Sequence, residues 1–161
     1  MHYACEDDSR SAVIPLLLAH PDMDVNVKNS SGSTPFYIAC YGRTSCVREL
    51  LKDSRVKVNE PDNYGRTPLW WAARDGYHDL IKVWIASGRE MDLGTPGDVE
   101  KTDSIGAAKM IGKYDDEAKK KSKTEVVSLL ERFKSDAAKT RSEVRKELGI
   151  TGQYHSFFSI H

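Results

Sequence analysis

The stretch GRTPLWWAARDGYHDLIKVWIASGREMDLGTPGD, residues 65–98, decides the fold. It predicts a tight turn before Pro68, a short helix over residues 68–74, a break at Gly76 and a second helix over residues 78–86. Proline suits the first turn of a helix because its missing N–H group costs nothing there, and glycine suits the position just after a helix end. The second helix is apolar on more than one side, and isolated helices of under about 12 residues are marginal in water. This helix pair therefore needs further units of the chain beside it.

An earlier copy of the same pattern lies upstream. A shift of 33 residues superimposes the turn-forming, small and apolar positions of the two copies: Gly32 on Gly65, Thr34 on Thr67, Pro35 on Pro68, Phe36 on Leu69, Ala39 on Ala72, Leu50 on Val83, Val58 on Met91 and Asn59 on Asp92. Self-similarity at a fixed period of this size is the signature of a repeat array, in which each unit buries its apolar side against the next.

Two segments, Gly32-Ser33-Thr34-Pro35-Phe36 and Gly65-Arg66-Thr67-Pro68-Leu69, resemble the opening of an ankyrin repeat, and Val58-Asn59 resembles its hairpin ending. From these motifs the chain is identified as an ankyrin-repeat protein. The resemblance implies an all-α fold, an ankyrin-repeat α-solenoid of helix-turn-helix pairs with β-hairpin loops. The family's usual histidine after Thr-Pro-Leu is replaced by Tyr37 and Trp70, so we expect aromatic packing in place of its inter-repeat hydrogen bonds.

The same register divides the chain into units. We expect ankyrin repeats over residues 1–134: an incomplete first repeat at 1–29, a second at 30–64, a third at 65–98 and a divergent fourth at 99–134 with an insertion at 112–123. The missing Thr-Pro opening of the first repeat indicates either an array with a frayed start or a chain cut from a longer one, and we favour the cut chain. The insertion is predicted to be either a lengthened first helix or a surface loop.

Two features mark the end of the array. In the fourth repeat, Asp103 follows Thr102 where the other openings have proline. Residues 135–149 have a helical spacing with a thin apolar stripe, which fits a C-terminal capping helix that turns one face to the array and one to water. Residues 150–161 form a tail, predicted either to dock on the stack or to be the scar of a truncation.

No group of residues has the spacing of a catalytic or metal site. The five histidines are scattered, and the neighbouring carboxylates near turns fit a solvated surface better than an acid–base pair. The sequence also lacks the Gly-x-x-x-x-Gly-Lys pattern of a phosphate-binding loop. We therefore predict no enzyme activity, no cofactor, no metal and no small-molecule substrate.

Composition indicates where the protein works. The 161 residues contain 24 basic and 24 acidic side chains, and no apolar run approaches the roughly 18 residues of a membrane span. The three cysteines have no Cys-x-x-Cys spacing, which fits free thiols in a reducing compartment. We expect an intracellular monomer, cytoplasmic or nuclear, that does not enter a membrane. The basic run at residues 119–123 is interpreted as a solvated face, not a nucleic-acid site.

The resemblance implies a noncatalytic protein–protein interaction module, a scaffold that binds a protein partner on its concave surface and hairpin tips. The partner-binding candidates carried over by position are Ser31, Ser33, Tyr41, Arg43, Asn63, Tyr64, Arg66, Arg74, Asp75 and Tyr77. Tyrosine and arginine are enriched in binding hot spots. Two other interpretations stay open: a regulatory or targeting segment of a larger enzyme, channel or signalling protein, and a structural spacer.

Asn26 and Asn59 carry a separate hypothesis. Each follows a valine and lies eight residues after a leucine, which resembles the acceptor of the asparaginyl hydroxylases that modify ankyrin repeats. The alternative is structural, because asparagine fits a hairpin and satisfies local backbone groups.

Overall fold

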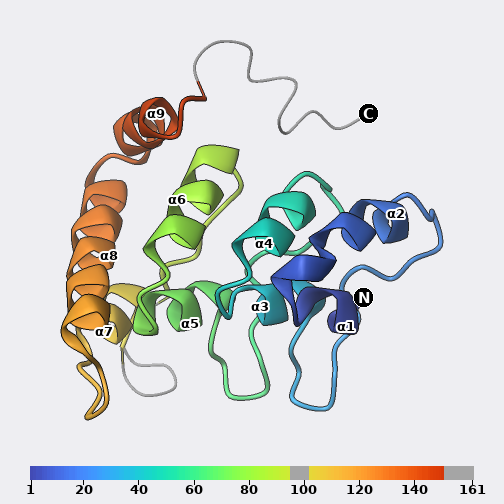
Figure 1. Ribbon diagram of the computed structural model, residues 1–161, viewed down its shortest axis with the longest axis horizontal. Helices are drawn as coiled ribbons and strands as arrows, with labels where there is room; N and C mark the ends of the chain where they lie inside the picture. The colour runs from blue at the N-terminus through green and yellow to red at the C-terminus, as the bar shows by residue number, and fades with distance from the viewer. Residues whose placement is uncertain (95–101, 151–161) are drawn as a thin grey trace.

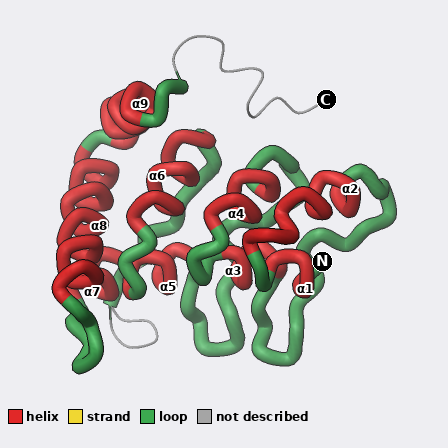
Figure 2. Tube along the Cα trace, in the orientation of Figure 1, coloured by secondary structure: helices red, strands yellow, loops and turns green. Residues whose placement is uncertain are grey.

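The computed structural model, which describes residues 1–94 and 102–150, is a row of helix pairs joined by long loops (Figures 1 and 2). In chain order the elements are α1 (His2–Cys5), the 3-10 helix η1 (Asp8–Val13), α2 (Ile14–Leu18), α3 (Pro35–Ala39), α4 (Thr44–Leu50), α5 (Pro68–Arg74), α6 (His78–Ser87), α7 (Ser104–Lys109), α8 (Glu117–Ser135) and α9 (Ala137–Glu147). The loops at residues 22–34 and 55–67, here called the first and second fingers, project to the same side of the row (Figure 1). No β-strand occurs in the described ranges, so both fingers turn back without strand pairing.

The Thr-Pro openings of α3 and α5 have the same local structure. Thr34 and Thr67 are the N-caps, and each hydroxyl accepts a hydrogen bond from the backbone N–H three residues further on, at 3.1 and 3.2 Å. Threonine is a favoured N-cap, and proline at the first helical position has the backbone angle that a helix needs. The helices predicted at residues 68–74 and 78–86 are confirmed as α5 and α6, the latter one residue longer.

The apolar layer between the helices runs through successive units. Leu50 and Val83, which the 33-residue shift superimposes, are 0% and 3% exposed. The rings of Phe36 and Trp84 meet edge to face at 4.9 Å, which joins the second repeat to the third. The layer continues to Val144 on α9, which is fully buried. Each unit therefore covers the apolar side of its neighbour, as the sequence predicts.

Arginine side chains add a second set of contacts between units. Arg55 donates hydrogen bonds to carbonyl groups at the end of α2, Arg89 to those at the end of α4, and both Arg141 and Arg145 to those at the end of α6. The last carbonyl groups of a helix lack intrahelical donors and carry partial negative charge. A guanidinium group there donates the missing hydrogen bonds and balances this charge. The end of each of these second helices is thus held by a later part of the chain.

The opening of α7 differs from the prediction in its register. Asp103, which the sequence alignment places where proline stands in the other openings, is itself the N-cap: its carboxylate accepts the N–H of Gly106 at 2.8 Å. Aspartate caps a helix at least as well as threonine, so the substitution keeps the cap while the proline is lost. Ile105 and Ala108 then face inward, at 7% and 2% exposed.

The insertion at residues 112–123 is not a lengthened first helix. Its first five residues form a loop, and its remaining residues are helical. α8 begins at Glu117, capped by Asp116, so residues 117–123 are extra turns at the start of the second helix. Lys123 is 4% exposed and pairs with Asp115, whose pKa it holds at about 2 through this hydrogen bond. These tertiary contacts therefore stabilise additional turns at the N-terminal end of α8, which the sequence pattern does not predict.

α9 packs on α6 and α8 at the end of the row (Figure 1). Its inner positions Thr140 and Val144 are buried, and most of its other side chains are exposed. This one-sided burial is consistent with the capping helix expected at residues 135–149, whose role stays a prediction, as do the repeat boundaries. The tail lies outside the described residues except for Ile150, which packs against the core. None of the described helices has the length and apolar character needed to cross a bilayer.

Candidate protein-interaction surface

The two fingers share a backbone and differ in the side chains at their tips. In the first finger, Asn29 Oδ1 accepts the N–H groups two and four residues further on, both at 3.0 Å. In the second, Asp62 Oδ1 accepts the corresponding N–H groups of Tyr64 and Arg66 at 2.9 and 3.0 Å. Asparagine and aspartate commonly close turns in this way. At the equivalent positions of this shared turn, the first finger has Ser31 and Ser33 and the second has Tyr64 and Arg66.

Side chains from α5, the second finger and the end of α3 converge on Trp71. The guanidinium carbons of Arg66 and Arg74 lie 4.8 and 4.6 Å from the centre of a Trp71 ring. The ring of Tyr41 is 5.4 Å from Trp71, and Arg66 also lies 4.6 Å from the Tyr64 ring. Such cation–π and aromatic contacts hold the groups in defined positions. We call these five residues the Trp71 cluster.

Arg66 is held on the inside by a buried acid. Its Nε and Nη2 atoms donate to Asp62 Oδ2 at 2.9 and 2.8 Å, and the Tyr37 hydroxyl donates to the same oxygen at 2.7 Å. Burial acts to raise the pKa of Asp62, but the hydrogen bonds from Tyr37 and Arg66 outweigh it and the net pKa is lowered. Burial, followed by the bond to Asp62, raises the pKa of Tyr37, which stays a neutral donor.

This network corrects the expectation about the missing histidine. Tyr37 lies on α3 and Asp62 on the following finger, so their hydrogen bond joins adjacent units as a polar contact. At Trp70, aromatic and cation–π contacts are present without a hydrogen bond: its ring lies 5.3 Å from Trp71 and 5.5 Å from the guanidinium carbon of Arg74. The indole Nε1 atoms of both tryptophans are buried and have no hydrogen-bond partner in the described structure. Tyr37 and Trp70, which both replace the family's usual histidine, therefore make different kinds of contact.

Other predicted contact residues lie apart from this cluster. Ser31 and Asn63 bring the two finger tips side by side, because the Asn63 N–H donates to the Ser31 carbonyl at 3.0 Å. Ser33, predicted to contact a partner, is only 4% exposed, since its backbone N–H turns inward to the asparagine of the first finger and the His2 ring nitrogen lies 2.9 Å from its carbonyl.

The remaining three predicted residues, at the ends of the first helices, contact other parts of the chain. Arg43 donates to the carbonyl of Glu6 at 2.9 Å, and Asp75 pairs with Lys119 at 3.4 Å. The ring of Tyr77 lies directly on the backbone of Gly42, where an added Cβ atom would come within 2.8 Å of it. Their contact with a partner stays a prediction.

Trp71, the centre of the cluster, was missed in the sequence. The signal was present: the 33-residue shift places Trp71 on Ile38 and Arg74 on Tyr41, so two positions change from one repeat to the next in a correlated way. Residues three apart on a helix are neighbours, which puts the new indole beside the new guanidinium. A comparison of the exposed positions, in addition to the core ones, would have found it.

The sequence pattern for ankyrin repeats in three copies matches residues 1–94, more than half of the chain. The chain belongs to the ankyrin-repeat family. Ankyrin repeats are protein–protein interaction modules, so the surface described above lies on a scaffold of the type used for recognition. The all-α solenoid predicted from the sequence is confirmed, although its hairpin loops have no strands among the described residues.

Several proteins contain similar ankyrin repeats. The chain is 36% identical over 94 residues to the human SMC5-SMC6 complex localization factor protein 1, which covers 55% of this chain and 8% of that protein. It is 30% identical over 92 residues to the human transient receptor potential cation channel subfamily A member 1, covering 55% and 8%. It is 31% identical over 90 residues to the putative ankyrin repeat protein YahD of Escherichia coli strain K12, covering 53% and 44%. The match thus spans less than half the length of each of these relatives.

Asn26 and Asn59, the two candidate hydroxylation sites, each bind the backbone of the following repeat. Asn26 Nδ2 donates to the carbonyl of Arg55 at 2.8 Å, and Asn26 Oδ1 accepts the N–H of Lys57 at 2.7 Å. Asn59 Oδ1 accepts the N–H of Asp92 at 3.1 Å. These bonds give both residues a structural role, and their hydroxylation stays a prediction.

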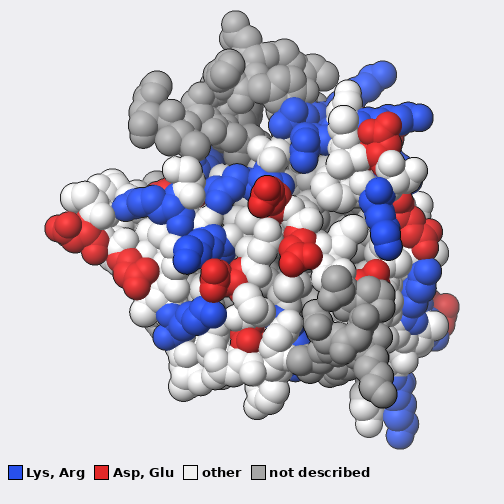
Figure 3. Space-filling model, turned by 180° about the vertical axis from the view of Figure 1, so that it is seen from behind, with Lys and Arg blue, Asp and Glu red and all other residues white. Residues whose placement is uncertain are grey.

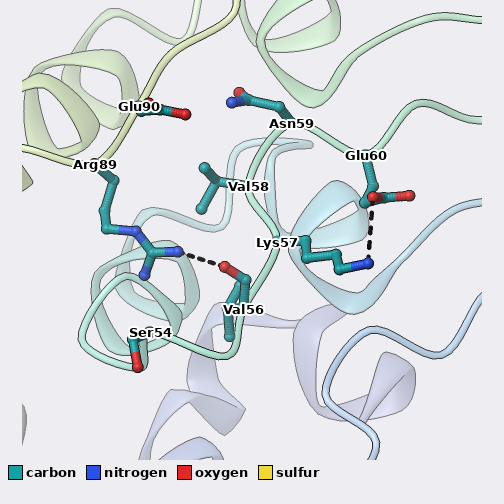
Figure 4. A pocket seen from close by; sticks show the side chains of 8 residues that line it. All are labelled: Ser54, Val56, Lys57, Val58, Asn59, Glu60, Arg89 and Glu90. Atoms are coloured by element: carbon teal, nitrogen blue, oxygen red, sulfur yellow. Dashed lines mark hydrogen bonds and ion pairs between the residues drawn. The ribbon is translucent and has the colours of Figure 1, made fainter.

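A groove of about 440 Å³ on the ankyrin stack lies beside the second finger and is lined by Ser54, Val56, Lys57, Val58, Asn59, Glu60, Arg89 and Glu90 (Figure 4). Three of its charged groups are engaged internally: Arg89 donates to the carbonyl of Val56, and Lys57 pairs with Glu60 at 3.7 Å. On the face shown in Figure 3, basic and acidic side chains are interspersed. No group of three or more His, Cys, Asp or Glu within the described ranges is arranged to hold a metal ion.

Proposed function

We propose that this chain is a noncatalytic protein-binding module whose contact surface is centred on the Trp71 cluster. The observation that supports this most directly is the convergence of two arginines, two tyrosines and a tryptophan at one place on the inner helices and the second finger. Tryptophan, tyrosine and arginine dominate binding hot spots, and here Tyr64 is 61% exposed. Ser31 and Asn63, at the adjoining finger tips, extend the same surface.

The module's oligomeric state and cellular compartment are part of what we propose. We expect it to act as a monomer inside the cell, in the cytoplasm or nucleus, without a cofactor, a small-molecule substrate, nucleic acid or a membrane. The three cysteines support a reducing compartment, since all are buried and unpaired. Burial raises the pKa of Cys5 to about 12 and that of Cys46 to about 11, so both stay protonated thiols.

The test is affinity capture with a variant that removes exposed contacts but not structural ones. Tyr64→Ala with Arg74→Ala leaves the bond between Arg66 and Asp62 in place, so the fold is retained. The matched control is Tyr114→Ala with Arg48→Ala: Tyr114 is 91% exposed, and Arg48 lies on the second helix α4. We expect proteins captured by the wild type and the control to be lost by the cluster variant. Equal capture by all three would contradict the proposal.

A second candidate function is a regulatory or targeting segment of a larger enzyme, channel or signalling protein. The names of two relatives favour it, one being a localization factor and the other a cation channel, each matched over a small share of its length. An antibody against residues of α8, used on material from the native cell, measures the size of the complete protein. A band at the 18.1 kDa of this chain would exclude this candidate.

A further inference from the structure

The two arginines of the Trp71 cluster differ in how their charge is balanced. Arg66 pairs with Asp62, and that carboxylate is 3% exposed. Arg74 lies over the rings of Trp70 and Trp71, at 5.5 and 4.6 Å, and makes no hydrogen bond or ion pair with any residue that the structure describes. The nearest acid in sequence, Asp75, pairs with Lys119 at 3.4 Å instead. Arg74 therefore holds an uncompensated positive charge at a fixed place.

The donors around Arg74 also lack acceptors. The Nε1 atoms of Trp70 and Trp71 are buried and unpaired in the described structure, and Trp70 as a whole is 4% exposed. On α3, by contrast, the equivalent side chain Tyr37 donates its only proton to Asp62. Because buried donors are normally satisfied, this unsatisfied pair distinguishes α5 from α3, and it lies beside the unpaired guanidinium group of Arg74. The Nε1 atoms themselves are closed to solvent, whereas Trp71 and Arg74 as whole residues are half-buried, so Arg74 is the polar group that a ligand meets first.

The chemistry of the cluster selects an anionic ligand. A guanidinium group binds a carboxylate through two parallel hydrogen bonds, which fixes its orientation as well as its position. A cationic ligand, such as a lysine side chain, would compete with Arg66 and Arg74 for the Trp71 ring and would be repelled by the unpaired charge of Arg74. The rings of Tyr41, Tyr64 and Trp71 offer contact area for an apolar side chain beside the carboxylate.

We propose that the Trp71 cluster binds a peptide segment of its partner that carries an aspartate or glutamate next to an apolar side chain. The carboxylate lies on Arg74, and the apolar side chain lies against Trp71 and the exposed ring of Tyr64. This inference rests on the proposed function and adds to it the chemistry of the partner.

The experiment is selection of a displayed library of random peptides on three forms of the full chain: wild type, Arg74→Gln and Arg48→Gln. Arg48 makes no described hydrogen bond or ion pair and lies away from the cluster, so its variant is the matched control. We expect peptides from the wild type and the control to be enriched in aspartate and glutamate. With Arg74→Gln, the acidic enrichment should fall to the level of the library. Circular dichroism checks that each variant is folded.

The best peptide then gives a quantitative test by fluorescence anisotropy. Arg74→Gln, or replacement of the peptide's acid by its amide, should weaken binding by roughly tenfold to a hundredfold, the range for a hydrogen bond to a charged group. Both changes together should weaken it no further, because they remove the same contact. Added salt should also weaken the wild-type complex more than the complex with Arg74→Gln.

Other outcomes separate this inference from the proposed function. Peptides without acidic enrichment whose binding still requires Trp71 would overturn the carboxylate contact and leave the interaction surface standing. Enrichment in lysine or arginine would overturn it as well. If no selected peptide depends on Trp71 for binding, both proposals are contradicted. Tighter Trp71-dependent binding of a fluorescein-labelled single-stranded oligonucleotide than of any peptide would show that the surface serves stacked bases.

Discussion

The first finger with α3 and the second finger with α5 are two copies of one structure that carry different side chains. Both fingers close on an asparagine or aspartate, and both helices start from a threonine cap. In the first copy the tip is serine, and Tyr37 turns its hydroxyl into an internal network. In the second, the tip and α5 carry Tyr64, Arg66, Trp71 and Arg74, and polar groups are left without partners. The repeat scaffold therefore keeps its caps and core fixed while the exposed positions change from one copy to the next.

The core shared by the two copies should give the largest effects. Phe36 and Leu69 are equivalent and fully buried, so Phe36→Ala should lower the free energy of unfolding by about 3–5 kcal/mol and Leu69→Ala by about 2–5 kcal/mol. Urea denaturation followed by circular dichroism measures both. A loss confined to one variant would mean that the two repeats do not share a cooperative core.

The second prediction concerns binding and separates the copies. Trp71→Ala should weaken binding of a captured partner by about 2 kcal/mol or more, the range of a hot-spot residue, or roughly thirtyfold. Ile38→Ala, the equivalent change on α3, should alter the affinity by less than about threefold, because it lies outside the cluster. Isothermal titration calorimetry with the purified partner measures both affinities. If Ile38→Ala has the larger effect, the contact surface lies over the second repeat.

The third prediction converts the second finger to the chemistry of the first. Asp62→Asn copies Asn29 and keeps the turn, but it removes the charge opposite Arg66 and should lower stability at neutral pH by about 1–3 kcal/mol. Because the folded pKa of Asp62 is lowered, its contribution is present above the unfolded value near 3.8 and is lost as pH falls through the lower folded pKa.

Thermal melts from pH 7 down to below that value check the sign. The wild type should lose melting temperature on acidification more steeply than Asp62→Asn, since the variant has already lost the titrating group. Parallel curves would show that Asp62 contributes no pH-dependent stability.

The smallest effect is expected from one hydroxyl group. Tyr37→Phe removes a single hydrogen bond to a carboxylate that keeps its bonds from Arg66, so the free energy of unfolding should fall by about 0.5–1.5 kcal/mol. Tyr114→Phe, at a side chain 91% exposed, is the control and should change nothing measurable. Peptide binding should be unaffected by either, and a loss of binding in Tyr37→Phe would place the network within the contact surface.

The sequence predicts the features that depend on neighbouring residues and does not predict those that depend on residues distant in the chain. The Thr-Pro caps, the second helices and the buried Leu50 and Val83 follow from periodicity and capping, which need only neighbouring residues. The backward extension of α8 was missed because Lys123 and Asp115 stabilise it through burial that no pattern shows. Trp71 was not predicted because the candidates on the first helices, such as Arg74, were those around the helix ends.

The sequence by itself determined the repeat: a 33-residue period with a cap, two short helices and an apolar face that a neighbour must cover. Local propensity and hydrophobic periodicity act along the chain, so they are readable there. Only the tertiary structure decided which polar groups meet across the repeats. Asp62 accepts hydrogen bonds from Tyr37 and Arg66, whereas Arg74 lies over Trp71 without an acidic partner. Such pairing depends on the distances between stacked units, and these are set by packing.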